Sequence, residues 1–130
     1  MCCTRRSLIV AAVGSGLPLP AEAATPKLVA AAFAMRDKAV AAGDQPYGAI
    51  VARDGEIVGW GPSRVRELGE WVGHAEREAM RDAQRRLGQD LSGCVMFSTS
   101  RPCGTCQRAA AQARLSRMYY GEDAVDAGRP

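Results

Sequence analysis

The 130-residue sequence has no run of apolar residues near the roughly 20 positions that a membrane-spanning helix requires, which excludes a multi-span membrane protein. It also lacks a strong charge: 17 Lys and Arg against 14 Asp and Glu leave +3, which by itself does not indicate nucleic-acid binding. Internal repeats are absent. With 47% hydrophobic and 24% charged residues, the composition is that of one globular domain and excludes a disordered or fibrous chain.

Residues 1–23 have the features of a cleavable export signal. Arg5 and Arg6 precede an almost uncharged apolar run over 8–19, and Ala21-Glu22-Ala23 supplies the small-x-small pattern that signal peptidase accepts. The paired arginines resemble a twin-arginine signal. A short helix is the alternative, against which the glycines and prolines of this segment argue. We therefore expect an exported, periplasmic protein, or a cytoplasmic one if the segment is not a functional signal.

Removal of that segment would leave a domain of residues 24–130 with three cysteines, Cys94, Cys103 and Cys106. An odd number of cysteines does not fit a disulfide framework. Cys94 lies in a short apolar run, and we interpret it as a small buried hydrophobic residue. The other two cysteines need a different explanation.

Hydrophobic periodicity and turn residues predict six elements in this domain. They are a helix over 26–42, a hairpin of strands at 47–53 and 56–61, a helix over 74–87, a strand at 94–98, a helix over 103–115 and a strand from 118. The Asp54-Gly55 pair is a strong hairpin signal. Residues 62–73 are expected to be mainly loop, and no element is expected after 121. This order predicts a mixed sheet flanked by helices in three layers.

Two short stretches carry the chemistry, His74-Ala75-Glu76 and Pro102-Cys103-Gly104-Thr105-Cys106. Two thiolates and an imidazole are three of the four ligands of tetrahedral zinc, and three protein ligands are typical of a catalytic site. The cysteine spacing lets both sulfurs reach one ion from the first turn of a helix, whose N-terminus favours their negative charge. A carboxylate at Glu76 would lie near the open position and can carry a proton from water to a leaving nitrogen, which is the chemistry of hydrolytic deamination.

His-x-Glu followed by Pro-Cys-x-x-Cys resembles the signature of the cytidine and deoxycytidylate deaminase-like superfamily. The runs at 46–51 and 77–81 are similar to its branch of guanine deaminases, cytosine deaminases and bacterial tRNA adenosine deaminases, and the resemblance covers about residues 26 to 121. It implies an α/β fold, the three-layer α/β/α cytidine deaminase-like fold with a mixed central sheet. We expect this fold to be shortened at its C-terminus, because the chain stops soon after Tyr120, where relatives continue.

The same resemblance assigns roles residue by residue. It implies one Zn²⁺ per chain, held by His74, Cys103 and Cys106. Zinc-bound hydroxide would attack the amine-bearing ring carbon of a nucleobase or nucleoside, with Glu76 as the proton shuttle and ammonia as the product. The residues expected to bind substrate are Tyr47, Gly48, Ala49, Ser63, Ala75 and Pro102, with the backbone N–H of Ala75 bonding the base. A homodimer is expected because relatives often form one, whereas the low charge and the expected export favour a small base or nucleoside over nucleic acid.

Two substitutions depart from the pattern of the family. Relatives carry Gly-x-Asn-Arg-Val after the second strand, but this chain contains no asparagine and has Ser63 at that position. Its side chain is shorter and lacks the paired donor and acceptor of an amide. The usual Ser-Glu-Pro-Cys becomes Ser100-Arg101-Pro102-Cys103, which places a cation beside the metal-binding turn. Zinc binding survives these changes, whereas the identity of the base stays open.

Two other interpretations remain. A degenerate relative would bind zinc without catalysis. Cys103-Gly104-Thr105-Cys106 also resembles the Cys-x-x-Cys of a thiol-disulfide protein of the thioredoxin type. That fold requires a long C-terminal half with a cis-proline strand, whereas only residues 107–130 follow here and their one proline is Pro130.

Overall fold

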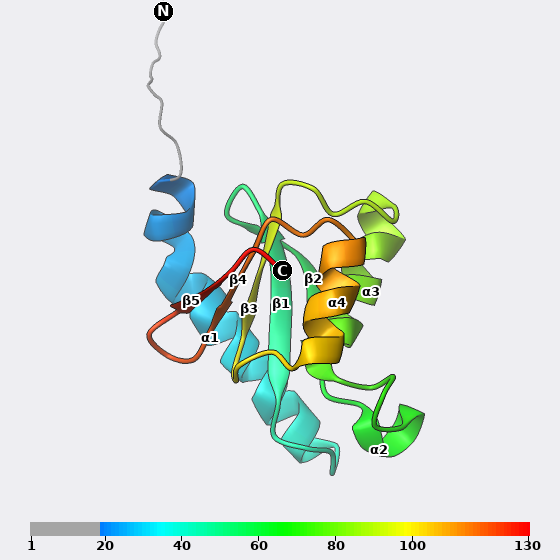
Figure 1. Cartoon of the computed structure of the whole chain (residues 1–130). Helices are drawn as coiled ribbons and strands as arrows, with labels where there is room; N and C mark the ends of the chain where they lie inside the picture. Colours follow the sequence, from blue (N-terminus) through cyan, green and yellow to red (C-terminus); the bar gives the residue numbers. More distant parts are fainter. Residues whose placement is uncertain (1–18) are drawn as a thin grey trace, which may run out of the picture.

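A five-stranded mixed sheet organises residues 19–130, the part of the chain described by the computed structural model (Figure 1). The elements are α1 (Leu19–Ala41), β1 (Gly48–Arg53), β2 (Glu56–Pro62), α2 (Val65–Leu68), α3 (Ala75–Leu87), β3 (Cys94–Ser98), α4 (Gly104–Gln112), β4 (Arg117–Tyr120) and β5 (Val125–Gly128). The strand order is β2-β1-β3-β4-β5, in which β3 and β4 are parallel and the other neighbours antiparallel. In residues 19–130, no helix combines the length and the apolarity that a membrane span needs.

Two apolar clusters, one on each face of the sheet, produce the predicted three layers. Side chains alternate along the buried central strand β1, as pleating requires. Ile50 and Ala52 pack with α1 residues such as Leu28, whereas Ala49 and Val51 join the cluster formed with α3 and α4. Figure 1 shows α1 on one side of the sheet and α3 with α4 on the other. The predicted α/β fold is therefore confirmed.

The hairpin of β1 and β2 forms where it was predicted. Asp54 and Gly55 have φ angles of 53° and 80°. A two-residue turn with positive φ at both positions matches the right-handed twist of the flanking strands, which is why Asp-Gly favours it. The strand at 94–98 also has the predicted bounds.

Three expectations about secondary structure were wrong. Helix α1 begins at Leu19, seven residues before the predicted start at 26, because an alanine-rich segment with high helix propensity precedes Pro26. The expected loop contains the short helix α2. The segment after 121 forms β5, which pairs antiparallel with β4. Only four residues long and partly exposed, β5 has no apolar alternation that would reveal it.

The predicted export signal lies mostly outside the described residues, which begin at 19. The predicted cleavage motif, 21–23, falls within α1. Export and the boundary at residue 24 stay predictions.

Helix α1 crosses β1 so closely that position 48 has no room for a side chain. A Cβ on Gly48 would lie 2.3 Å from the backbone N of Arg36 and 2.4 Å from the backbone O of Ala32. The clashing atoms belong to the backbone of α1, so a Cβ at position 48 fits only if the whole helix moves. Gly48 therefore sets the distance between α1 and the sheet.

We predict that Gly48→Ala lowers the free energy of unfolding by about 1–3 kcal/mol, the usual effect of overpacking. Gly104→Ala is the matched control, because the nearest atom to its Cβ would be 3.7 Å away, at Arg108 Nη1. Alanine there is expected to leave stability unchanged or raise it by at most about 1 kcal/mol. Urea unfolding of both variants measures the difference, and equal stabilities would contradict the close approach of α1.

Candidate metal centre

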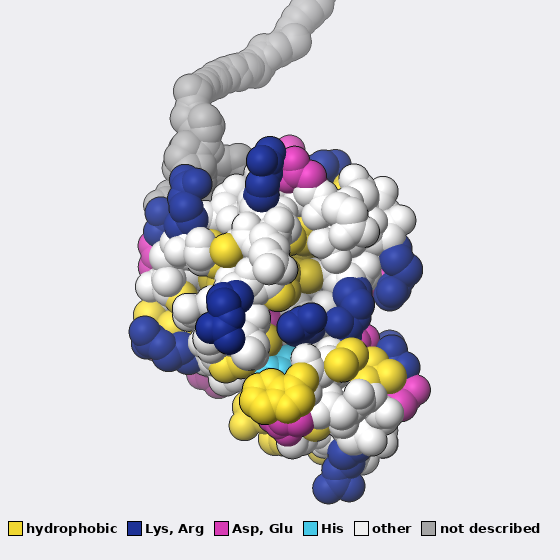
Figure 2. Space-filling model, turned by 45° about the vertical axis from the view of Figure 1, so that its right-hand side comes forward, with side chains coloured by type: hydrophobic (Ala, Val, Ile, Leu, Met, Phe, Trp, Pro, Cys, Tyr) yellow, Lys and Arg dark blue, Asp and Glu magenta, His cyan; other side chains and the backbone are white. Residues whose placement is uncertain are grey.

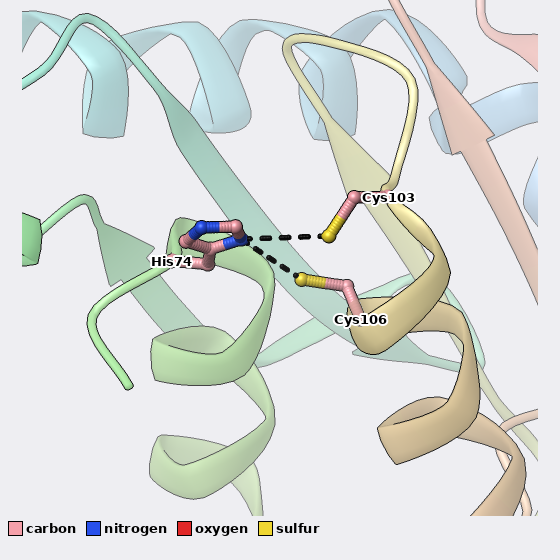
Figure 3. Close-up of side chains that lie close together, drawn as sticks. All are labelled: His74, Cys103 and Cys106. Carbon is pink, nitrogen blue, oxygen red and sulfur yellow. Dashed lines mark hydrogen bonds between the residues drawn. The ribbon is translucent and has the colours of Figure 1, made fainter. Parts of the chain in front are cut away.

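The N-termini of α3 and α4 meet at one end of the sheet, and each presents a potential ligand at its N-cap. His74 precedes α3 and makes no side-chain capping hydrogen bond to it, and Cys103 precedes α4. Figure 3 shows the imidazole of His74 and the thiols of Cys103 and Cys106 pointing toward one another.

The distances among these side chains are those of ligands around a common ion. His74 Nδ1 lies 3.4 Å from Cys106 Sγ and 3.6 Å from Cys103 Sγ. All three ligand atoms lie within 4.8 Å of one another. Zinc bonds of about 2.3 Å to sulfur and about 2.0 Å to nitrogen, at a tetrahedral angle, separate N from S by about 3.5 Å. The donor set and its spacing therefore fit zinc.

The two thiols differ in their tendency to ionise. Burial works to raise the pKa of Cys103, but hydrogen bonds from the Thr105 hydroxyl and the Cys106 backbone N–H outweigh it and lower the pKa to about 7. The Thr105 oxygen lies 3.0 Å from Cys103 Sγ. Burial, followed by the negative charge of Glu76, raises the pKa of Cys106. A cation bound between the sulfurs would favour both thiolates.

Glu70 holds the far side of the imidazole. Its Oε2 lies 3.2 Å from His74 Nε2, the ring nitrogen that does not face the sulfurs. Burial works to lower the pKa of His74, and the hydrogen bonds to Glu70 and Cys103 raise it overall. Such a carboxylate fixes the ring orientation and tautomer of a metal-binding histidine. Nothing in the sequence pattern singled out Glu70, because it lies in the turn between α2 and α3, where spacing along the chain does not show which side chains meet.

Glu76 lies beside the sulfurs, on the first turn of α3. Glu76 is 7% exposed, and Cys106 Sγ donates to Glu76 Oε1 at 3.8 Å. Burial raises the pKa of this carboxyl, and its own backbone N–H and the charge of His74 offset the rise only in part. The structure thus places the predicted proton carrier next to the predicted metal ligands.

A cavity of about 720 Å³ opens onto this cluster. Figure 2 shows the cyan histidine recessed between hydrophobic and basic side chains. Three of the residues expected to bind substrate line the cavity, Tyr47, Ser63 and Ala75, together with His74, Glu76 and Cys103. Its remaining lining residues are Gln45, Pro46, Val65, Glu70, Ser100 and Arg101.

The other three residues expected to bind substrate lie behind this surface. Gly48 and Ala49 are buried in β1, and Pro102 is buried before α4. Gly48 instead ties the start of β1 to the loop after β3, since its N–H donates to Thr99 Oγ1 at 3.1 Å and its carbonyl accepts from the Thr99 N–H at 2.9 Å. Substrate contact by any of the six stays a prediction.

Ser63 faces the cavity with its hydroxyl already engaged. The Ser63 hydroxyl donates to Asp44 Oδ1 at 3.0 Å, while Asp44 Oδ2 accepts from the Arg66 backbone N–H. Burial works to raise the pKa of Asp44, but these bonds and one from the Gln45 N–H lower it overall. Ser63 is one of the residues expected to bind substrate. In this arrangement it offers a substrate only the lone pairs of its oxygen.

The profile of the family described as "Cytidine and deoxycytidylate deaminase zinc-binding region" matches residues 24–122, which is most of the chain. The chain belongs to this family.

Relatives place the chain near the nucleobase and nucleoside deaminases, as the motifs indicated. It is 39% identical over 77 residues to tRNA-specific adenosine deaminase of Agrobacterium fabrum, covering 58% of this chain and 51% of that protein. It is 40% identical over 99 residues to tRNA(Ile)-lysidine synthase of Deinococcus radiodurans, covering 75% of this chain but 17% of that protein. The X-ray structure of guanine deaminase from Bacillus subtilis aligns with a TM-score of 0.68 at 30% identity, covering 73% of this chain and 62% of that one. The chain thus spans about half, or less, of the length of the two curated relatives.

We predict that Cys106→Ser removes stoichiometric zinc, because the site loses one of its three protein ligands. Cys94→Ala is the control, since Cys94 is a buried core residue on β3 and is not part of the ligand group. Metal analysis of dialysed protein measures the content. One zinc per chain in the control and none in Cys106→Ser is expected, and full zinc content in Cys106→Ser would contradict the assignment.

We also predict that Glu70→Gln weakens zinc binding by about 10- to 100-fold, because the carboxylate orients His74. Glu67→Gln provides a matched control, since Glu67 is an exposed glutamate three residues away whose partner is Arg64. Competition against a chromophoric chelator gives both affinities. Equal affinities in the two variants would show that Glu70 does not support the ligand.

Proposed function

We propose that this chain catalyses zinc-dependent hydrolytic deamination of a nucleobase or nucleoside. The observation that carries the proposal is the convergence of His74, Cys103 and Cys106 beside Glu76 at the surface of one cavity. Membership of the deaminase family supports the class of reaction. The choice of a base or nucleoside as substrate is our inference from the cavity and the relatives.

His74, Cys103 and Cys106 would hold the metal, leaving the cavity side open to a water molecule. A bound zinc ion would supply Lewis acidity and bring the pKa of that water to about 7. Glu76 would accept a proton from the water and return it to the departing amine. In the balanced reaction, the oxygen of water replaces the exocyclic nitrogen on the ring carbon, and the nitrogen leaves as ammonia.

The cavity offers means to hold a flat ring. Ala75 is the first residue of α3, and N–H groups of a first helical turn lack intrahelical partners. Its N–H would donate to a carbonyl or ring nitrogen of the base. Tyr47, which is 43% exposed, offers an aromatic face for stacking, and Ser63 offers an acceptor.

The alternatives have less support. A thiol-disulfide protein of the thioredoxin type would have a different fold, whereas this chain has the deaminase fold and family. A non-catalytic zinc module would not require a buried carboxylate beside the ligands or a cavity over them. Export and a homodimer remain part of the proposal, and each awaits its own experiment.

We predict that Glu76→Gln lowers kcat for ammonia release by about 10²- to 10⁴-fold, the usual contribution of a positioned acid or base. Zinc content should stay at one per chain, because Glu76 is not a ligand. The assay uses zinc-loaded protein with guanine, cytosine, adenine and their nucleosides, and Glu56→Gln on β2 is the control. A wild-type protein that holds zinc yet releases no ammonia from any of these compounds would favour the non-catalytic module.

A further inference from the structure

The two cysteines of the metal centre are held in different ways. Cys106 is fully buried on α4, so packing fixes its side chain. Cys103 stands at the N-cap of α4 and is exposed, which leaves the staggered positions of its single side-chain torsion accessible. Figure 3 shows that its sulfur nevertheless points toward His74, whose Nδ1 is 3.6 Å away. A polar contact, rather than packing, is therefore needed to hold Cys103 in this position.

Thr105 supplies that contact from the first turn of α4. Its hydroxyl oxygen lies 3.0 Å from Cys103 Sγ. The residue is half-buried, and its β-branched side chain restricts the directions in which the hydroxyl can point. A thiolate has no proton to give, so with a metal bound the hydroxyl is the donor. The backbone N–H of Cys106 also donates to this sulfur, but a change of side chain at position 105 leaves that donor in place.

We propose that Thr105 is a positioning residue of the metal centre, whose hydroxyl donates to Cys103 Sγ and holds this sulfur beside the other two ligands. The inference rests on the proposed zinc site and gives a role to a residue outside the ligand set. Groups that hydrogen-bond to metal ligands orient them, and hydrogen bonds to a cysteine sulfur tune the metal that it binds. Thr105 therefore raises the affinity for zinc and limits the negative charge that Cys103 donates to the ion.

The charges around the sulfurs explain why such a donor is useful. Cys106 Sγ donates to Glu76 Oε1 at 3.8 Å, and it can no longer do so as a thiolate. Two thiolates and a carboxylate then lie close together, and their mutual repulsion opposes assembly of the site. The Thr105 hydroxyl draws part of this charge away from Cys103. A less strongly donating sulfur also leaves the metal more electrophilic, which favours the ionisation of water that the proposed reaction needs.

Zinc affinity tests the hold on Cys103. Thr105→Val replaces the hydroxyl by a methyl group, whereas Thr105→Ser keeps the hydroxyl and removes the methyl group. Competition against a chromophoric chelator should show about 10- to 100-fold weaker zinc binding for Thr105→Val. Thr105→Ser should keep most of the affinity of the unaltered protein. Equal affinities in all three proteins, or equal losses in the two variants, would overturn the inference.

Cobalt in place of zinc tests the hydrogen bond itself. Thiolate-bound Co²⁺ has a sulfur-to-cobalt charge-transfer band, whose energy rises when a donor stabilises the electrons of the sulfur. At saturating cobalt, the band of Thr105→Val should therefore lie at longer wavelength than the bands of Thr105→Ser and the unaltered protein. A merely structural effect of valine would weaken binding without moving the band. An unshifted band in saturated Thr105→Val would overturn the inference.

Neither measurement depends on turnover, so failure of the inference and failure of the proposed reaction are distinguishable. An affinity and a band position that depend on the Thr105 hydroxyl, without ammonia release from any base or nucleoside, would uphold the inference and contradict deamination. Ammonia release by a protein whose affinity and band are unchanged in Thr105→Val would do the reverse. A chain that binds neither zinc nor cobalt would overturn both.

Discussion

The site depends on one topological constraint, which is that two helices begin at the same end of one sheet. Strands β2 and β3 are each antiparallel to β1, so they run in the same direction. Helix α3 follows β2 after a loop and α4 follows β3, and both pack on one face of the sheet. Their N-termini therefore meet, and His74 and Cys106, 32 residues apart in sequence, come within 3.4 Å. The positive ends of both helices also favour thiolate ligands.

Other features of the site follow from this meeting of helix ends. The first turn of α3 carries Glu76 to the sulfurs, and the loop before it returns Glu70 to the imidazole. The loop before α4 carries Arg101 to the same cavity, where Tyr120 at the end of β4 orients it. Gly48 contributes both to the fold and to the position of the site. Its lack of a side chain lets α1 pack closely on the sheet face opposite the site. Its backbone also ties β1 to the loop after β3.

Local signals in the sequence were sufficient to predict the α/β class and to name the candidate ligands. Asp54-Gly55 indicated the hairpin, and the two motifs indicated His74, Cys103 and Cys106, which the topology then brings together. Contacts across loops were not predictable in this way. The bond between Ser63 and Asp44 joins residues 19 apart, and Asp44 also accepts from the backbone N–H of Arg66 in α2. The strand β5 was not predicted, because its four residues carry no strand pattern and it forms by pairing with β4.

X-ray absorption at the zinc edge tests the central claim most directly, because it reads the ligands of the ion itself. For the zinc-loaded protein, the account predicts two sulfurs at about 2.3 Å and one imidazole nitrogen at about 2.0 Å, with a light atom in the fourth position. A first shell without sulfur, or one with no imidazole in the unaltered protein, would contradict the convergence of these three side chains on one metal.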